Sequence, residues 1–340
     1  MRVLVTGAAG FVGSNVVHEA ADLGLDVVGI VRSPPPLPDP RCTYVVADLL
    51  DVAATEAAVE QARPDAVVHT AIFNDLVRLY SERRLAWDSY VGVTHTLADA
   101  ANEIGALLVT VSTDWVFDGW EGGYEEETPP NPVNFYGVLK AMSEVVTLER
   151  AGLGTVARIA GVIGIHRARP ALPRGQDAGF GYFVASLVDS LENGDPFTVW
   201  ESDAINMRAT PSLASHSARL LLELCERRLT GVYHCVGAEA TTRMELARAS
   251  AEVFGLDASL LRSGPPDPKA LPPAPVPHDT SLDARATAVA LGVSLPSVRE
   301  LLELFRAERA ADTGDGARLT RPRRPWEDRS LRARPDSTRA

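Results

Sequence analysis

The chain has 340 residues, of which 46% are apolar and 23% charged, and this composition is ordinary for a globular protein with a substantial core. Its formal net charge of −12 argues against nucleic acid as a partner, because phosphate backbones are bound by concentrated lysine and arginine. The cysteines, Cys42, Cys225 and Cys235, are odd in number and form no CxxC pair, so neither a disulfide framework nor a metal site is predicted.

The N-terminal part alternates short apolar runs with helical patterns. Arg2 to Thr6 is predicted to be a buried strand that ends at the turn of Gly7, and Phe11 to Leu23 carries apolar residues at helical spacing. Further strands are predicted at Leu25 to Val31, Tyr44 to Ala47, Ala66 to Thr70 and Leu107 to Ser112. Strands buried on both faces and joined by helices indicate a parallel sheet, and right-handed crossovers make it an α/β doubly wound Rossmann fold.

The start of the chain carries no pattern of a targeting segment. The first strand begins at Arg2, and no apolar run approaches the roughly 18 residues that a membrane span needs. We therefore expect a cytoplasmic protein with no membrane partner.

The alternation loosens after about residue 165. The segment from His166 to Gly181 is rich in glycine, arginine and proline and is expected to form a loop near the site. Helices are predicted at Tyr182 to Glu192 and Ser212 to Arg227, and a strand at Gly231 to Val236. The proline-rich segment from Gly264 to Pro277 can form neither a regular helix nor an inner strand.

These patterns divide the chain into three parts. Residues 1–165 are expected to bind a dinucleotide, and the chain is expected to return to this domain around residues 205–240. Residues 166–308 are expected to form a smaller C-terminal substrate-binding lobe. Residues 309–340 lose apolar periodicity and accumulate arginines, which is typical of a disordered basic tail without a catalytic role.

The segment GAAGFVG lies between the first strand and its helix. Gly7 permits the tight turn, Gly10 allows backbone to approach a pyrophosphate, and Gly13 lets the helix pack close to the strand. Phe11 and Val12 begin the helix, whose N–H groups can bind anionic oxygen. The five residues therefore form a predicted cofactor-binding turn, although a glycine turn can also be purely structural.

The residues after the next strands indicate which dinucleotide binds. Arg32 stands where many dinucleotide folds carry an acidic residue, and its guanidinium can pair with the 2′-phosphate of NADP, with Ser33 as a further donor. This favours NADP(H), with NAD(H) as the alternative, because an exposed arginine at a strand end can also be without a ligand. The other expected cofactor contacts are Asp48 and Leu49, where the carboxylate can instead cap a turn, and Thr70 and Ala71, beside His69.

The segment YGVLK places Tyr136 and Lys140 one helical turn apart on the same face. A nearby ammonium lowers the pKa of a phenol, and Lys140 can also hold a ribose hydroxyl of the cofactor. Upstream, the fifth predicted strand ends at Ser112 and Thr113, where open α/β sheets bind their ligands. Thr113 can bind the substrate oxygen that Tyr136 protonates, whereas ordinary turn capping is the alternative for both residues.

With these motifs, the sequence resembles the extended short-chain dehydrogenases/reductases, and among them the dTDP-4-dehydrorhamnose reductase family. The resemblance covers about residues 1 to 305. It is carried by GAAGFVG, by STDWVFDG at 112–119 and by NFYGVLKAMSE at 134–144, and less specifically by ATP at 209–211, GVYHCVG at 231–237 and TSLD at 280–283. It implies a catalytic triad of Thr113, Tyr136 and Lys140.

The sequence departs from the family at positions that bear on the substrate. Trp115 replaces the usual tyrosine, and Val276 and Pro277 stand where an Arg-Pro pair is common. Arg208 resembles the diphosphate-binding arginine of sugar-nucleotide epimerases. We expect the substrate contacts to be Ser112, Asp114, Trp115 and Arg208. The basic loop with His166, Arg167, Arg169 and Arg174 can either clamp phosphates or be solvated.

The related sugar-nucleotide dehydratases follow the catalytic threonine with Asp-Glu, whereas here Asp114 is followed by Trp115. Loss of that glutamate removes the usual base for elimination, so the resemblance implies NADPH-dependent reduction of a keto group on a nucleotide-activated, 4-keto-deoxy sugar. The alternatives are an NAD(P)-dependent nucleotide-sugar epimerase and a non-catalytic regulatory subunit that keeps the nucleotide site. A homodimer is the default expectation for such an enzyme.

Overall fold

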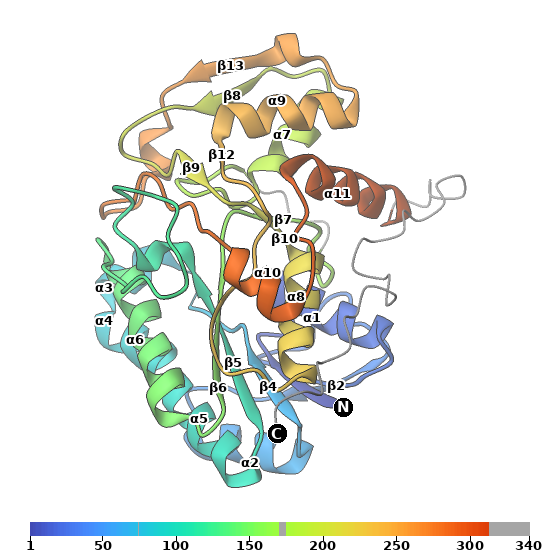
Figure 1. Cartoon of the computed structure of the whole chain (residues 1–340), viewed down its shortest axis with the longest axis vertical. Coiled ribbons are helices and arrows are strands. Elements are labelled where there is room, and N and C mark those ends of the chain that lie inside the picture. The colour runs from blue at the N-terminus through green and yellow to red at the C-terminus, as the bar shows by residue number, and fades with distance from the viewer. Residues whose placement is uncertain (74, 170–174, 313–340) are drawn as a thin grey trace, which may run out of the picture.

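A computed structural model describes residues 1–73, 75–169 and 175–312, and its lower half is built on one parallel sheet (Figure 1). The sheet has seven strands in the order β11-β6-β5-β4-β1-β2-β3. Their bounds are β1 Arg2–Thr6, β2 Asp26–Val31, β3 Cys42–Val46, β4 Ala66–His69, β5 Leu107–Thr113, β6 Gly154–Ile159 and β11 Gly231–His234. The predicted doubly wound α/β fold is confirmed, and the predicted strands lie within a residue or two of their expected ends.

The register of the sheet brings the ends of its central strands to one edge. Thr6, at the end of β1, pairs with His69 of β4 on one side and with Ile30 of β2 on the other. The apolar pattern did not predict β6, although all its residues are buried, because Thr155 and Arg158 interrupt that pattern.

Helices cover both faces of the sheet (Figure 1). One face is covered by α1 (Phe11–Asp22) and α8 (Ala214–Glu226), which pack on each other. The other carries α2 (Val52–Ala62), α5 (Val93–Ile104) and α6 (Phe135–Arg150), reached through α3 (Leu76–Ser81), α4 (Arg83–Trp87) and a π-helical turn at Asp88–Gly92. The apolar stripes of these helices bury the strands on both sides, which explains why β1 and β4 are apolar without alternation.

A second layer lies above the carboxyl edge of the sheet and has its own apolar core (Figure 1). It contains α7 (Phe183–Glu192), α9 (Arg243–Phe254), α11 (Val298–Asp312) and the parallel pair of β8 (Phe197–Trp200) with β13 (Leu261–Gly264). Short pairs join it to the sheet layer: β7 (Val162–Ile163) with β10 (Ser212–Leu213), and β9 (Arg208–Ala209) with β12 (Thr241–Thr242). Helix α10 (Arg285–Leu291) contacts β11, where the chain returns to the main sheet as predicted.

The C-terminal boundary differs from the expected one. Helix α11 continues to Asp312, and Arg309 pairs with Asp189 and Glu192 of α7 at 2.8 Å each. The start of the predicted tail at residue 309 is therefore wrong by a helical turn, because these two carboxylates stabilise the last turn of the helix. Residues 313–340 lie outside the described residues.

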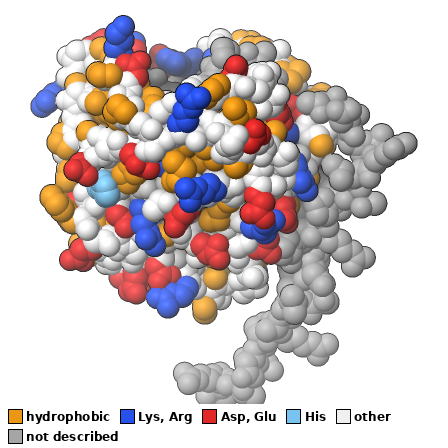
Figure 2. All heavy atoms as spheres, turned by 90° about the horizontal axis from the view of Figure 1, so that it is seen from above, with side chains coloured by type: hydrophobic (Ala, Val, Ile, Leu, Met, Phe, Trp, Pro, Cys, Tyr) orange, Lys and Arg blue, Asp and Glu red, His pale blue; other side chains and the backbone are white. Residues whose placement is uncertain are grey.

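The surface above the second layer mixes charges of both signs. Acidic and basic side chains are interspersed on the face that Figure 2 shows, among scattered apolar groups. Within the described ranges, no helix is both long and apolar enough to cross a bilayer. In the proline-rich segment after Gly264, the only helical turn described is a 3₁₀ turn at Pro268–Ala270, as its prolines predict.

Candidate active site

The glycine turn lies at the carboxyl edge of the sheet between β1 and α1. Gly7 has φ +66°, and a Cβ on it would lie 2.7 Å from the Cα atom of Ala71. A Cβ on Gly13 would lie 2.2 Å from the Gly7 carbonyl oxygen, so both positions exclude a side chain. Gly10 caps α1 without a side-chain hydrogen bond, and the N–H groups of the first turn at Phe11 and Val12 follow it.

The end of β4 closes the other side of this turn. The Thr70 hydroxyl donates to the Thr6 carbonyl at 2.7 Å, and the Ala71 N–H donates to the Thr6 hydroxyl at 3.4 Å. The Thr6 hydroxyl also lies 2.7 Å from Nδ1 of His69, whose pKa burial lowers to about 3. The structure thus brings Thr70 and Ala71 beside Gly7, as a shared cofactor crevice requires.

The residues expected at the adenosine end follow β2 and β3. Arg32 and Ser33 are exposed, and the structure gives Arg32 no hydrogen bond or ion pair to another described residue. Asp48 accepts a hydrogen bond from the Leu50 N–H at 3.1 Å, so it caps a turn, which was the alternative to an adenine contact. Leu49 is partly buried against the core beneath it. The Arg32 guanidinium is therefore available to bind a ligand phosphate.

The predicted catalytic residues meet between β5 and α6. Tyr136 lies beside Thr113, whose side chain lowers the pKa of the phenol, and its ring contacts Trp115 and Tyr90 edge-on, with centroids 5.9 and 6.1 Å away. Lys140 lies one turn further along α6 and donates from Nζ to the Val111 carbonyl at 2.5 Å. The triad implied by the resemblance is therefore assembled at the end of β5.

The expected effect of Lys140 on Tyr136 is not found. Burial between aromatic rings raises the pKa of Tyr136 to about 12, and the nearby Asp114 carboxylate also raises it. The Lys140 ammonium lies 5.8 Å from the ring of Tyr90, and burial lowers the pKa of Lys140 to about 8. Tyr136 is thus a protonated phenol at neutral pH, which makes it a proton donor rather than a phenolate.

Ser112 was expected at the substrate, but its side chain is buried on the opposite side of the strand from Thr113. Its hydroxyl donates to Glu144 of α6 at 2.5 Å. Arg158 of β6 binds the same carboxylate in a fork, with contacts of 3.0 and 2.8 Å. Strand alternation directs Ser112 into this buried ion pair, so a substrate contact for it is wrong. The sequence patterns predicted no role for Glu144 or Arg158, although Glu144 ends the NFYGVLKAMSE motif.

Asp114, which follows β5, contacts Thr280 of a distant segment of the chain. The carboxylate is 4% exposed and accepts a hydrogen bond from Thr113 at 3.0 Å and another from Thr280. Burial raises the pKa of Asp114 to about 6. Thr280 was noted only within the less specific TSLD motif, and the contact between residues 166 positions apart gave no signal in the sequence.

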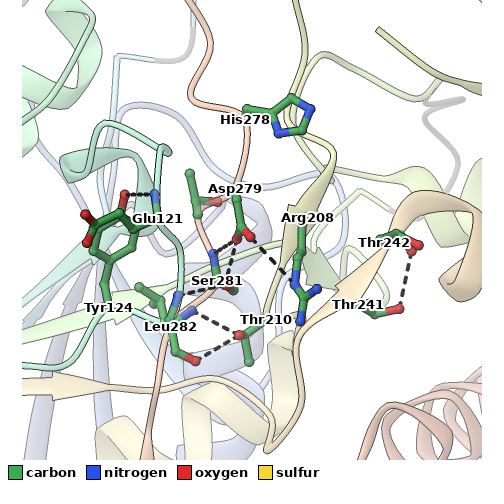
Figure 3. A network of polar contacts seen from close by, with 12 residues as sticks. Glu121, Tyr124, Arg208, Thr210, Thr241, Thr242, His278, Asp279, Ser281 and Leu282 are labelled. Atoms are coloured by element: carbon green, nitrogen blue, oxygen red, sulfur yellow. Dashed lines mark hydrogen bonds and ion pairs between the residues drawn. The ribbon is translucent and has the colours of Figure 1, made fainter. Parts of the chain in front are cut away.

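Arg208 belongs to a different set of contacts from the triad (Figure 3). Its side chain is half exposed, and its Nε lies 3.7 Å from the carboxylate of Asp279. Asp279 also accepts from the N–H and hydroxyl of Ser281. These residues line a pocket of about 490 Å³ together with Glu121, Gly122, Gly123, Ala238, Ala240, Leu282, Asp283 and Arg285. Thr113, Trp115 and Tyr136 do not line it, so the structure does not bring Arg208 to the triad.

The basic loop is partly accounted for by contacts within the protein. Arg167 lies 3.7 Å from Glu308 and 3.7 Å from Asp312 of α11, and the ring of His166 lies 5.9 Å from that of Phe11. Arg174 lies outside the described residues. Arg167 therefore has acidic partners in the protein without a phosphate.

One acidic cluster brings possible metal ligands together on α1. Side-chain atoms of His18, Glu19 and Asp22 lie within 4.8 Å of one another. Arg41 lies 2.7 Å from Asp22, and Arg219 pairs with Glu19, so cations already neutralise both carboxylates. We infer no metal site from this cluster.

Comparison with protein families and relatives places the site in context. Residues 1–310 match the family described as RmlD substrate binding domain. Methionine adenosyltransferase 2 subunit beta of Xenopus tropicalis is 30% identical over 283 residues, which are 81% of this chain and 78% of that protein. A probable low-salt glycan biosynthesis reductase of Haloferax volcanii is 28% identical over 308 residues, covering 90% of this chain and 98% of that protein.

Solved structures give the same picture of the fold. A hypothetical dTDP-4-dehydrorhamnose reductase from Sulfolobus tokodaii has a TM-score of 0.72 and 26% identity, covering 87% of this chain and 97% of that chain. The dTDP-4-dehydrorhamnose reductase from Bacillus anthracis, solved in complex with NADP, has a TM-score of 0.74 and 21% identity, covering 90% and 99%. At that identity the second likeness bears on the fold alone.

Proposed function

Because the chain belongs to the RmlD substrate-binding-domain family of extended short-chain dehydrogenases/reductases, we propose that it is an NADPH-dependent reductase of a nucleotide-activated 4-keto-deoxy sugar. One observation carries the proposal: Tyr136 lies beside Thr113 at the sheet edge that also holds the glycine turn. Protonation of a substrate oxygen needs a proton donor and an orienting hydroxyl close together, and these two residues can supply them.

The crevice fits a dinucleotide. Gly7 and Gly13 form a cradle that a Cβ would fill, and the first turn of α1 offers N–H groups that no cap side chain occupies. Exposed Arg32 and Ser33 supply donors for a 2′-phosphate, which supports NADP(H), while NAD(H) remains the alternative. When bound, NADPH supplies the hydride that the reduction needs.

The chain's own residues handle the proton. Tyr136, with a pKa of about 12, holds its proton at neutral pH and donates it to the carbonyl oxygen as negative charge develops there. Thr113 orients that oxygen, and Lys140 binds a ribose hydroxyl. Trp115 and Asp114 border the substrate, and Trp115 stands where elimination would need a glutamate, which supports simple reduction.

The proposal assigns parts of the chain to the two ligands. Residues 1–165, with the return around 205–240, bind the cofactor, and residues 166–308 form the substrate lobe. The nucleotide sugar is the expected partner, and a homodimer is the expected assembly.

A screen of keto-sugar nucleotides with NADPH tests this function. We expect loss of NADPH absorbance with at least one substrate, in proportion to the alcohol formed. Isomerised sugar without net NADPH consumption would instead identify an epimerase, and no turnover on any keto sugar would overturn the proposal.

A second function is favoured by the name that several relatives share. The Xenopus tropicalis protein is named as a subunit of an adenosyltransferase, so this chain can instead be a nucleotide-binding subunit. Purification of the chain from its own cells distinguishes the two, since a subunit elutes with a stoichiometric partner and turns over no keto sugar. Elution without such a partner, together with NADPH consumption, excludes it.

A further inference from the structure

Arg243 is the first residue of α9, and its side chain is completely buried. A cation at a helix N-terminus is unfavourable, because the positive end of the helix dipole lies there. Burial adds a desolvation cost and lowers the pKa of Arg243 to about 10. The start of the helix does not need this residue, since Thr242 and Glu245 already form a capping box.

The contacts of the guanidinium explain its position. Nε donates to the carbonyl of Asn206 at 2.7 Å, and Nη2 donates to the carbonyls of Asp177, at 3.0 Å, and of Gly179. The Asn206 N–H donates to the carbonyl between them, that of Ala178, at 2.8 Å. Arg243 and Asn206 therefore hold three successive carbonyls of the segment 177–179.

Two aromatic rings pack against the Arg243 guanidinium. The guanidinium carbon lies 4.9 Å from the ring centroid of Phe180 and 5.5 Å from that of Phe183. Its Nη1 has no hydrogen-bond partner in the described part of the chain. An arginine kept for stability alone would be an expensive choice here, because a hydrophobic side chain of similar volume avoids the unpaired N–H.

The held segment lies against the candidate active site. A Cβ on Gly179 would lie 3.3 Å from Cζ2 of Trp115, and the Trp115 ring contacts Tyr136. On the other side, the Asn206 amide donates to the Thr280 hydroxyl at 3.0 Å, and Thr280 donates to Asp114. Arg243 thus connects two elements that border Tyr136, the segment 177–179 and the Asp114–Thr280 contact.

We propose that Arg243 is a positioning residue that sets the wall of the substrate cleft beside Trp115, and hence the size of the sugar that binds. The identity of the ligand rests on the proposed function, whereas the positioning does not. Arg243 acts through the backbone of residues 177–179 and touches no reacting atom.

Hydrogen exchange followed by mass spectrometry tests the positioning without any substrate. In Arg243→Met, we expect the backbone N–H of Asn206, which donates to the Ala178 carbonyl, to exchange at least about tenfold faster, because Arg243 no longer holds the segment that accepts this bond. Arg248→Met is the matched control, since Arg248 is exposed on the same helix, and we expect its exchange to equal that of the wild type. Equal protection in Arg243→Met overturns the proposal.

Turnover tests the consequence for the cleft. We expect Arg243→Met to raise the KM for the keto-sugar nucleotide by about tenfold, to change kcat by less than about threefold and to leave NADPH affinity unchanged. Gly179→Ala keeps the Arg243 contacts but adds a methyl group against Trp115, so it should also raise KM, with unchanged exchange, even if Arg243→Met does not fold. Unchanged KM in Gly179→Ala overturns the cleft assignment, whereas a wild type that reduces no keto sugar refutes only the proposed function.

Discussion

The two sides of the crevice are built by different kinds of contact. On the cofactor side, Gly7 and Thr70 follow the neighbouring strands β1 and β4, so strand register brings them together, and Gly13 of α1 packs against both. On the substrate side, Asp114 meets Thr280 and Arg243 meets Asp177, pairs that lie 166 and 66 residues apart.

Two buried arginines show the same difference. Arg158 in the sheet pairs in a fork with the carboxylate of Glu144, so its charge is neutralised within the core. Arg243 binds backbone carbonyls of a loop. Arg158 thus joins a strand to a helix through one ion pair, whereas Arg243 holds the backbone of a loop and lies near the Asp177 carboxylate. A substitution on the cofactor side should therefore alter one contact, whereas a substitution on the substrate side should also displace the neighbouring loops.

The largest effect is expected where the two sides meet. Tyr136→Phe should lower turnover by about two to four orders of magnitude while NADPH affinity stays the same, because only the proton donor is removed. Steady-state kinetics and a cofactor titration measure both quantities. Tyr233→Phe is the matched control, since among the described residues its hydroxyl donates to the Thr230 carbonyl, away from the triad. Near-normal turnover in Tyr136→Phe would exclude this residue from the mechanism.

Arg32→Asp tests whether the cofactor side acts locally. An exposed guanidinium on a phosphate is worth about 1.5 to 3 kcal/mol, so wild type should bind NADPH about ten- to a hundredfold more tightly than NADH. The variant should reverse this order, because its carboxylate repels the phosphate and accepts from ribose hydroxyls. Fluorescence titration gives the four dissociation constants, with exposed Arg262→Asp as the control. Equal wild-type affinities would refute the assignment.

Asp114→Asn tests how strongly the substrate side depends on one buried carboxyl. Burial raises the pKa of Asp114 to about 6 from an ordinary 3.8. Between these two pH values the folded state therefore binds more protons than the unfolded state. The free energy of unfolding should consequently fall as pH rises from about 4 to 6. The variant should lack this decline, a difference of about 2 to 3 kcal/mol. Urea unfolding from pH 4 to 7 measures it. Fully exposed Asp203→Asn should keep the wild-type profile, and parallel profiles for wild type and Asp114→Asn would contradict the prediction.

The smallest effect is expected at Arg208. The side chain is half exposed and holds only a 3.7 Å ion pair, so Arg208→Ala should raise KM for a nucleotide sugar a few-fold, by less than about 1 kcal/mol, with little change in kcat. Initial rates over a range of substrate concentrations measure the split. Arg285→Ala, which removes another arginine that lines the same pocket, is the comparison. An unaffected KM would show that Arg208 is a solvated surface residue that does not bind the substrate.

Patterns local in the sequence were sufficient for every strand of the sheet except β6, and for the positions of Tyr136 and Lys140. Apolar runs predict the strands, GAAGFVG predicts the turn, and the spacing of Tyr136 and Lys140 places both on one face of α6, because each depends only on neighbouring residues. For the same reason, the apolar run that forms β2 was enough to place Arg32 at the end of a strand.

Only the tertiary structure decided what surrounds the triad. It turned Ser112 toward Glu144, raised rather than lowered the pKa of Tyr136, and brought Thr280 to Asp114. The direction of a side chain and the pKa of a buried group depend on which distant segments exclude water around it, and the separation of those segments along the chain leaves no periodic signal. Contacts between loops therefore position the side chains on the substrate side of the crevice, whereas strand register positions those on the cofactor side.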